Sequence, residues 1–306
     1  MELNAIRTRL GEMAQHVSPR HRRYRDLLDS LTLDPDDLTR PVGPPSDQDF
    51  IICGSPRSGT SLLCAMLYQP PSAVSVLEPW DGLRLPPAEL FASLRREIEQ
   101  TGRLERGRLD VEGMLRDGRV DWGRDGECGH DIRVDERYLL GVKWPAFWRY
   151  LELLPETKFL VCLRDPIEVI SSYRLKGGRL VLGLEYEVAF NRKLNEELVR
   201  ATRNPALRRI LLYDAINLRM LPYLDRPNVL AVRYERWFTD RDGMIQEMSD
   251  FLGVELGPGA PVLRPPRTES GLTTGELELI REHCRSAEPL GYALAGRAAP
   301  ASKPSR

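Results

Sequence analysis

Short apolar runs alternate along the chain with longer stretches in which apolar residues recur every three or four positions. The short runs have the length and continuity of strands that are buried on both faces of a parallel sheet, whereas the longer period predicts helices. The expected strands cover residues 50–53, 74–77, 139–142, 159–163 and 229–232. Strands that alternate with helices predict an α/β fold with a mostly parallel central sheet flanked by helices on both faces.

The helical pattern and the composition divide the chain into three parts. Helices are expected over 61–68, 184–203, 206–221 and 241–252, and helix-like stretches also follow the strands at 139–142 and 159–163. The segment 101–137 is charged and Gly-rich, which predicts an irregular or partly helical insertion. We therefore expect an N-terminal helical segment and linker over 1–47, a single domain over 48–290, and a disordered tail over 291–306.

Charge and apolar content narrow the class of partner. The chain has 44 basic and 45 acidic residues, a net charge of −1, whereas proteins that bind nucleic acid or a membrane surface generally carry a surplus of positive charge. No apolar run approaches the roughly 18 residues of a membrane span, and the first residues lack the apolar stretch of a signal peptide. The sequence therefore predicts a cytoplasmic protein with no membrane span. Its five cysteines lack metal-ligand spacing and are expected to be reduced thiols.

A phosphate-binding loop is predicted at residues 54–61, Gly-Ser-Pro-Arg-Ser-Gly-Thr-Ser. The segment follows an expected strand and opens an expected helix, where free N–H groups and the helix dipole attract an anion. Its spacing is that of the P-loop, GxxxxGK[ST], but Thr60 stands where the lysine belongs. Because that lysine neutralises the β- and γ-phosphates in nucleoside triphosphatases, ordinary ATP or GTP hydrolysis is disfavoured. Arg57 supplies a cation three residues earlier.

A second anion site is predicted where the strand 159–163 ends. This strand delivers Arg164 at its carboxyl end, Pro166 begins a helix, and Ser172 lies about two turns along it. Ligands of parallel α/β proteins bind at the carboxyl edge of the sheet, so Arg164 should point into the same crevice as the loop at 54–61. Two anion sites on one edge imply a ligand with two separated phosphates.

Four motifs in order give the chain a family resemblance. The stretch 56–63, PRSGTSLL, resembles the 5′-phosphosulfate loop of sulfotransferases that use 3′-phosphoadenosine 5′-phosphosulfate (PAPS), and 164–173, RDPIEVISSY, resembles their 3′-phosphate motif. The stretch 141–145, GVKWP, resembles the lysine-containing strand end of that family. Residues 232–235 with 251–253 resemble its adenosine-side strand and following helix. The resemblance spans about 48–255 and implies the P-loop-like sulfotransferase fold, a three-layer α/β/α arrangement.

The resemblance also implies how the nucleotide is held. The nucleotide-binding residues would be Arg57, Ser58, Gly59, Thr60, Ser61, Arg164, Ser172 and Tyr234. The first five would bind the 5′-phosphate and the leaving sulfuryl group, the next two the 3′-phosphate, and the tyrosine would line the adenine pocket. Lys143, together with Arg57, would stabilise the transition state. PAPS would be the sulfuryl donor, adenosine 3′,5′-bisphosphate the product, and no metal would be required.

The general base is the point at which the chain departs from part of the family. Cytosolic small-molecule sulfotransferases typically carry Lys-Thr-His at the strand end, whereas this chain has Lys-Trp-Pro at 143–145. Protein-tyrosine and some carbohydrate sulfotransferases instead use a glutamate after the second strand, and Glu78 stands in that place. We expect Glu78 to be the base, with Asp81 as the second and His130 as the third candidate; a role for Glu78 in capping or pairing stays open.

The acceptor is expected to be a small molecule with a hydroxyl group, such as a lipid, a glycoside or a specialised metabolite. It would enter a pocket built from 80–85, 101–137, 144–148 and the helices after residue 172, where several aromatic residues suit either an apolar ligand or the core. Two other classes of protein remain compatible with the loop: a P-loop nucleotide or small-molecule kinase, and a non-catalytic nucleotide-binding module.

Overall fold

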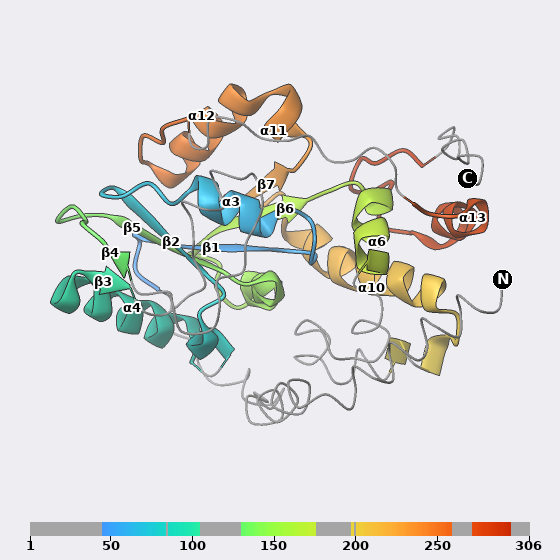
Figure 1. Cartoon of the computed structure of the whole chain (residues 1–306), viewed down its shortest axis with the longest axis horizontal. Helices are drawn as coiled ribbons and strands as arrows, with labels where there is room; N and C mark the ends of the chain where they lie inside the picture. Colours follow the sequence, from blue (N-terminus) through green and yellow to red (C-terminus); the bar gives the residue numbers. More distant parts are fainter. Residues whose placement is uncertain are drawn as a thin grey trace, which may run out of the picture.

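A five-stranded parallel sheet forms the centre of the molecule (Figure 1). The structure, a computed structural model, describes residues 45–83, 85–104, 130–175, 197–198, 200–258 and 271–294. The strand order is β2-β5-β1-β6-β7. The strands are β1 (Asp49–Gly54), β2 (Ala73–Leu77), β5 (Leu139–Lys143), β6 (Lys158–Leu163) and β7 (Val229–Arg233). All five predicted strands are confirmed, each to within one residue at either end.

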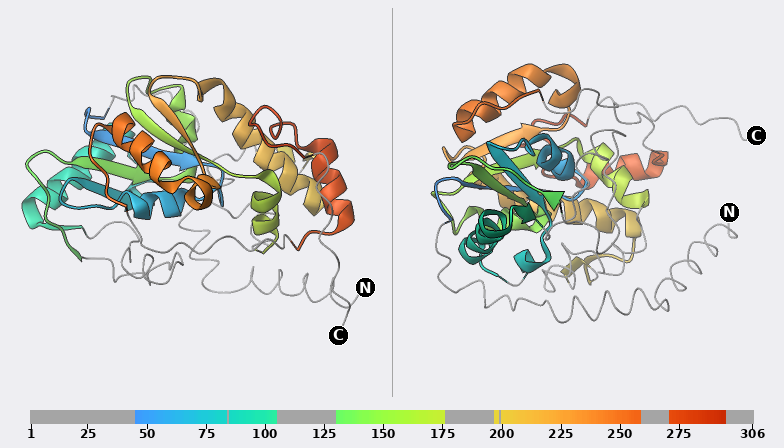
Figure 2. Two further views of the ribbon diagram at one scale, coloured as in Figure 1. Left: turned by 90° about the horizontal axis from the view of Figure 1, so that it is seen from above. Right: turned by 60° about the vertical axis from the view of Figure 1, so that its left-hand side comes forward.

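Helices cover both faces of this sheet, as Figure 2 shows. One face carries α4 (Pro87–Thr101), η3 (Pro145–Leu151), α6 (Pro166–Leu175), α10 (Pro205–Met220) and α13 (Thr274–His283). The other carries α3 (Thr60–Met66), α11 (Arg236–Thr239) and α12 (Arg241–Leu252). Successive residues of β1 point into the two cores in turn, because side chains alternate along a strand. The predicted three-layer α/β/α architecture is confirmed.

The remaining elements are short and include a small second sheet. Single-turn helices are η2 (Trp80–Leu83) and η4 (Leu221–Tyr223), and β3 (Arg103–Leu104) pairs antiparallel with β4 (His130–Asp131). This small sheet joins the two ends of the predicted insertion, of which residues 105–129 lie outside the described part. Most of the helix expected at 184–203 also lies outside it. Within the described ranges no helix is long and apolar enough to cross a bilayer.

Two details differ from the sequence prediction. The stretch after β5 is the 3₁₀ helix η3, which begins at Pro145, and helices α4 and α13 were not anticipated. Beyond residue 290, where the domain predicted from the sequence ends, Tyr292 is buried and its hydroxyl donates to Glu235 Oε2 at 3.2 Å. The packed chain therefore continues past 290, while 1–44 and 295–306 lie outside the described residues.

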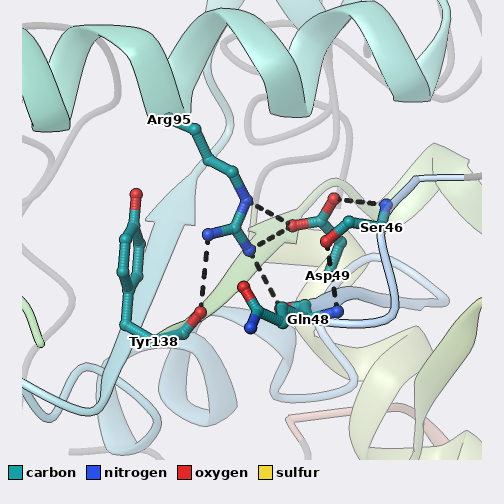
Figure 3. A network of polar contacts seen from close by, with 5 residues as sticks. All are labelled: Ser46, Gln48, Asp49, Arg95 and Tyr138. Carbon is teal, nitrogen blue, oxygen red and sulfur yellow. Dashed lines mark hydrogen bonds and ion pairs between the residues drawn. The ribbon is translucent and has the colours of Figure 1, made fainter. Parts of the chain in front are cut away.

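A partly buried ion pair fixes α4 to the amino edge of the sheet (Figure 3). Arg95 donates from Nε and Nη2 to Asp49 Oδ1 at 3.0 and 2.6 Å. The same guanidinium donates to the carbonyl oxygens of Gln48 and Tyr138, and Ser46 N–H donates to the other carboxylate oxygen of Asp49. The opposite, carboxyl edge carries the predicted site.

Candidate active site

The loop between β1 and α3 has a backbone conformation that favours glycine at two positions. Gly54 and Gly59 have φ of 147° and 103°, and a Cβ at Gly59 would overlap the ring of Tyr234. The N–H and hydroxyl of Ser58 both donate to the carbonyl oxygen of Ser55, at 3.1 and 2.6 Å, which closes the turn. The first turn of α3 has neither a side-chain cap nor an acidic residue. Its N–H groups therefore remain suited to an anion.

The second predicted anion site lies directly beside this loop. Arg57 Nε donates to Ser172 Oγ at 2.8 Å, and Arg164 Nη1 donates to the carbonyl oxygen of Arg57 at 3.2 Å. The Arg164 guanidinium also lies over the ring of Tyr234, with its carbon 4.0 Å from the ring centroid, and contacts Glu168 at 3.4 Å. The structure thus brings together four side chains that the sequence placed in one crevice.

One donor of this group is left over. Arg164 Nε is buried and has no hydrogen-bond partner among the described residues. A buried N–H on a cation is costly unless it meets an acceptor. An anionic ligand at this position would supply that acceptor.

Lys143 and Glu78 form a buried ion pair at the carboxyl ends of β5 and β2. Their side chains are 2% and 9% exposed, and Lys143 Nζ is hydrogen-bonded to Glu78 Oε1. The N–H of Glu78 donates to the carbonyl oxygen of Lys143 at 2.9 Å, and the φ of Glu78 is 48°, a left-handed value that is unusual for a non-glycine residue. The sequence named both residues as candidates and left a pairing role for Glu78 open, but it did not identify Lys143 as the partner.

The aromatic residues after Lys143 belong to the core. Trp144 is 2% and Phe147 is 4% exposed, and the indole N–H of Trp144 donates to the carbonyl oxygen of Pro79 at 3.0 Å. Of the other two base candidates, Asp81 lies on η2, and the side chain of His130 lies outside the described residues. The two buried rings are therefore part of the core and do not form an open aromatic surface.

The profile of the sulfotransferase family matches residues 49–258, more than half of the chain. The chain belongs to the sulfotransferase family. The matched region includes every nucleotide-binding candidate and the pair of Lys143 and Glu78. None of the curated proteins compared with the sequence matches it.

Several solved sulfotransferases are similar to this chain at low identity. STF9 from Mycobacterium avium is 16% identical, with a TM-score of 0.41, over 90% of this chain and 84% of that one. The sulfotransferase domain of the Synechococcus PCC 7002 olefin synthase is 18% identical, with a TM-score of 0.40, over 85% and 90%. Mouse SULT7A1, solved with PAP, is 13% identical, with a TM-score of 0.35, over 84% and 69%.

The structure of this sulfotransferase adds residues that the motifs did not indicate. On α10, Asn217 donates to Ser55 Oγ at 2.7 Å, and the Tyr213 hydroxyl donates to the carbonyl oxygen of Arg164 at 2.9 Å. Both side chains are buried. The only signal in the sequence is a pair of polar residues four positions apart on the buried face of a predicted helix, which by itself does not identify their partners.

Burial sets the protonation of two kinds of side chain around the site. It raises the pKa of the Tyr234 phenol, although the nearby Arg164 acts in the opposite direction, so this tyrosine is neutral at physiological pH. Burial likewise raises the pKa of the Cys64 thiol to about 12. The four described cysteines are unpaired and buried, and Cys128 lies outside the described residues. Thiol chemistry therefore has no part in this site as described.

Proposed function

We propose that this sulfotransferase moves a sulfuryl group from PAPS to a hydroxyl of a small-molecule acceptor. The observation that carries the proposal is the convergence of Arg57, Ser172 and Arg164 on one edge of the sheet. Two phosphates on one nucleotide would match two cationic sites that touch each other. The family of the chain supports the transfer, and the motifs support this donor.

The donor set fits such a nucleotide. Arg57 and the N–H groups of residues 58–61 would hold the 5′-phosphate and the sulfuryl group, while Arg164 and Ser172 would hold the 3′-phosphate. The Ser172 hydroxyl accepts from Arg57, so its own hydrogen can be donated to a phosphate oxygen. The unpartnered Arg164 Nε provides a further charged donor. Tyr234, which packs on Gly59, would lie beside the adenine.

Lys143 and Glu78 would share the chemistry. PAPS supplies an activated sulfuryl group together with a nucleotide that takes up negative charge as it leaves. The Lys143 ammonium would stabilise that charge, and the Glu78 carboxylate would accept the proton of the acceptor hydroxyl. As an ion pair, the two groups already carry the charges that these roles require. For the reaction, Lys143 would have to leave Glu78 and contact the leaving nucleotide, and Glu78 would have to contact the acceptor hydroxyl.

Binding and turnover experiments together test the proposal. Isothermal titration should show binding of adenosine 3′,5′-bisphosphate, and incubation with PAPS and a generic phenol should give a product heavier by one sulfate. Binding of ATP without binding of the bisphosphate would overturn the proposal in favour of a kinase. Bisphosphate binding without transfer to the phenol or to any hydroxyl compound of a cell extract would leave a non-catalytic binding module.

The acceptor class rests on the sequence prediction of a small hydroxyl compound in a cytoplasmic protein. A lipid, a glycoside or a specialised metabolite would fit it. Because Trp144 and Phe147 are core residues, they do not argue for an aromatic acceptor. A mass-spectrometric screen of cell metabolites, treated with enzyme and PAPS, would identify the compounds that gain one sulfate.

A further inference from the structure

One face of α10 contacts both predicted phosphate-binding elements. Asn217 is 1% exposed, and its side-chain amide donates to Ser55 Oγ at 2.7 Å and to the carbonyl oxygen of Tyr213 at 2.8 Å. Ser55 is itself buried and begins the loop that contains Arg57. The carbonyl oxygen of Ser55 also accepts the two hydrogen bonds from Ser58 that close the loop. Asn217 thus contacts Ser55, the residue whose carbonyl oxygen closes the turn of the loop.

Tyr213 makes the matching contact with the second element. Its hydroxyl donates to the carbonyl oxygen of Arg164 at 2.9 Å, at the point where β6 passes into α6. Burial raises the pKa of the Tyr213 phenol, so the hydroxyl keeps the proton that it donates. Tyr213 therefore contacts the backbone of the residue predicted to bind the 3′-phosphate.

The helix links these two contacts rigidly. Residues 213 and 217 are four positions apart, so they lie one above the other on the same helix face, and the Asn217 amide is bonded to the Tyr213 carbonyl. Moving one loop relative to the other would require breaking a buried hydrogen bond. The spacing of the two loops is therefore tied to the pitch of an α-helix.

These polar contacts are not needed to bury the helix. Ile210, Leu212, Ile216 and Met220 already supply apolar packing from α10 to the core. An apolar residue of similar shape at 213 or 217 would still pack, but it would leave the Arg164 carbonyl oxygen or the Ser55 hydroxyl without this donor. The contribution particular to the hydroxyl and the amide is the position of the loops.

We propose that Tyr213 and Asn217 are positioning residues that set the distance between the two phosphate-binding loops. They thereby select a nucleotide with phosphates on both the 3′ and the 5′ carbon of the ribose. This inference rests on the proposed function. It adds a determinant of donor specificity on a helix that contributes none of the predicted phosphate ligands.

The test compares a ligand that spans both loops with one that occupies a single loop. Adenosine 3′,5′-bisphosphate and adenosine 5′-monophosphate are titrated into the wild type, Tyr213→Phe and Asn217→Leu. Each variant should lower the preference for the bisphosphate about two- to tenfold, the range for one hydrogen bond, because the monophosphate is indifferent to the spacing. The KM for PAPS should rise in parallel, while the KM for the acceptor stays unchanged.

Asp214→Asn is the matched control on the same helix. The Asp214 carboxylate accepts from the N–H groups of Arg285 and Ser286 and from the Ser286 hydroxyl, and none of these hydrogen bonds is to either loop. This variant should lose stability and keep the wild-type preference. An equal loss of preference in Asp214→Asn would assign the effect to general destabilisation and overturn the inference.

The outcomes also separate the inference from the function on which it rests. Wild-type preference in both Tyr213→Phe and Asn217→Leu would overturn the inference while leaving the proposed function intact. A wild type that does not bind the bisphosphate would instead overturn the proposed function. If Asn217→Leu fails to fold, Tyr213→Phe decides the question, since it removes a single oxygen atom.

Discussion

Arg57 and Glu78 share an unusual backbone conformation. Among the residues that the structure describes, they are the only non-glycine residues with positive φ, at 70° and 48°. For an L-residue this region costs about 1 to 2 kcal/mol, and such strain is concentrated at functional sites. The strain coincides with the two side chains predicted to meet the sulfuryl donor and the acceptor.

Replacement of Arg57 separates strain from binding. Arg57→Gly should be about 1 kcal/mol more stable than Arg57→Ala, the reverse of the usual order, because glycine accepts positive φ freely. Both variants should lose at least about tenfold in bisphosphate affinity, since a charged hydrogen bond to phosphate is removed. Urea unfolding and calorimetric titration measure the two effects. An alanine variant as stable as the glycine variant would show that the backbone is not strained.

The Glu78 side chain offers a direct test of the base. Glu78→Gln keeps an oxygen that can accept a hydrogen bond from Lys143, but the glutamine amide cannot act as a base near neutral pH. Turnover should fall by about 10² to 10⁴, the usual contribution of a general base, while the bisphosphate affinity stays unchanged. Unchanged turnover would remove Glu78 from the mechanism, and Asp81→Asn, the second candidate, would then be assayed in the same way.

The sequence motifs predicted the side chains of the site better than their mutual contacts. The proximity of Arg57, Arg164 and Tyr234 was predictable because each follows a strand of the sheet, and the sheet brings strand ends together; Ser172 lies on the helix that follows Arg164. The pairing of Glu78 with Lys143 was not, because it depends on the relative positions of β2 and β5 and on a left-handed residue that no short motif marks.

At the scale of elements, α4 is held to the sheet by the ion pair of Arg95 and Asp49. Asp49 is 3% exposed, and burial raises the pKa of its carboxyl above the ordinary value of 3.8, although Arg95 acts in the opposite direction. Arg95 therefore offsets part of the cost of burying this charge. Its guanidinium also joins the start of β1 to the start of β5, through the carbonyl oxygens of Gln48 and Tyr138 (Figure 3).

Removal of Arg95 should destabilise the protein in a pH-dependent way. Arg95→Met leaves the Asp49 carboxylate buried without its cation, which should cost about 3 to 5 kcal/mol at pH 7. Losing Arg95 raises the folded-state pKa of Asp49 further above its unfolded value. The folded variant then binds a proton first as pH falls towards 4, so its deficit relative to wild type should shrink.

Urea unfolding at pH 7 and at about pH 4 would measure that deficit. Asp49→Asn/Arg95→Met is the matched control, because it has no buried charge at this position and its deficit should not shrink as the pH falls. A deficit of Arg95→Met that stays constant between the two pH values would show that Asp49 is not the group responsible.

The sequence predicted strands more reliably than helices, for a physical reason. A strand buried on both faces is a continuous apolar run, whereas α4 buries one face and exposes charges on the other. Its buried residues Leu90, Phe91, Leu94 and Ile98 do follow the helical period, so the signal was present but diluted. The seven residues of η3 are too few for the spacing of apolar residues to distinguish a 3₁₀ helix from an α-helix, and packing decides between them.

On the scale of the whole molecule, the core extends beyond the region that the family profile matches. The match ends at residue 258, yet Leu277, Ile280, Leu290 and Tyr292 belong to the same buried cluster as the sheet. Arg233 on β7 donates to the carbonyl oxygen of Leu290 at 2.7 Å, and its guanidinium lies over the ring of Tyr292. The C-terminal segment is therefore part of the domain's core.

Two truncations test this conclusion. A chain ending at residue 290 should be less stable than a chain ending at residue 294 by about 3 to 5 kcal/mol, the usual cost of removing a buried aromatic side chain. Thermal and urea unfolding of the two truncated chains would measure the difference. Equal stability would mean that Tyr292 adds nothing to the fold.

The position of β1 at the centre of the sheet also bears on how the protein is made. β1 comes first among the described strands, but its partners β5 and β6 follow about 90 and 110 residues later. During synthesis this wholly buried strand cannot pair until β5 and β6 have been made, and such long-range pairing slows folding. β1 and the phosphate loop attached to it should therefore take shape only after β6 has left the ribosome.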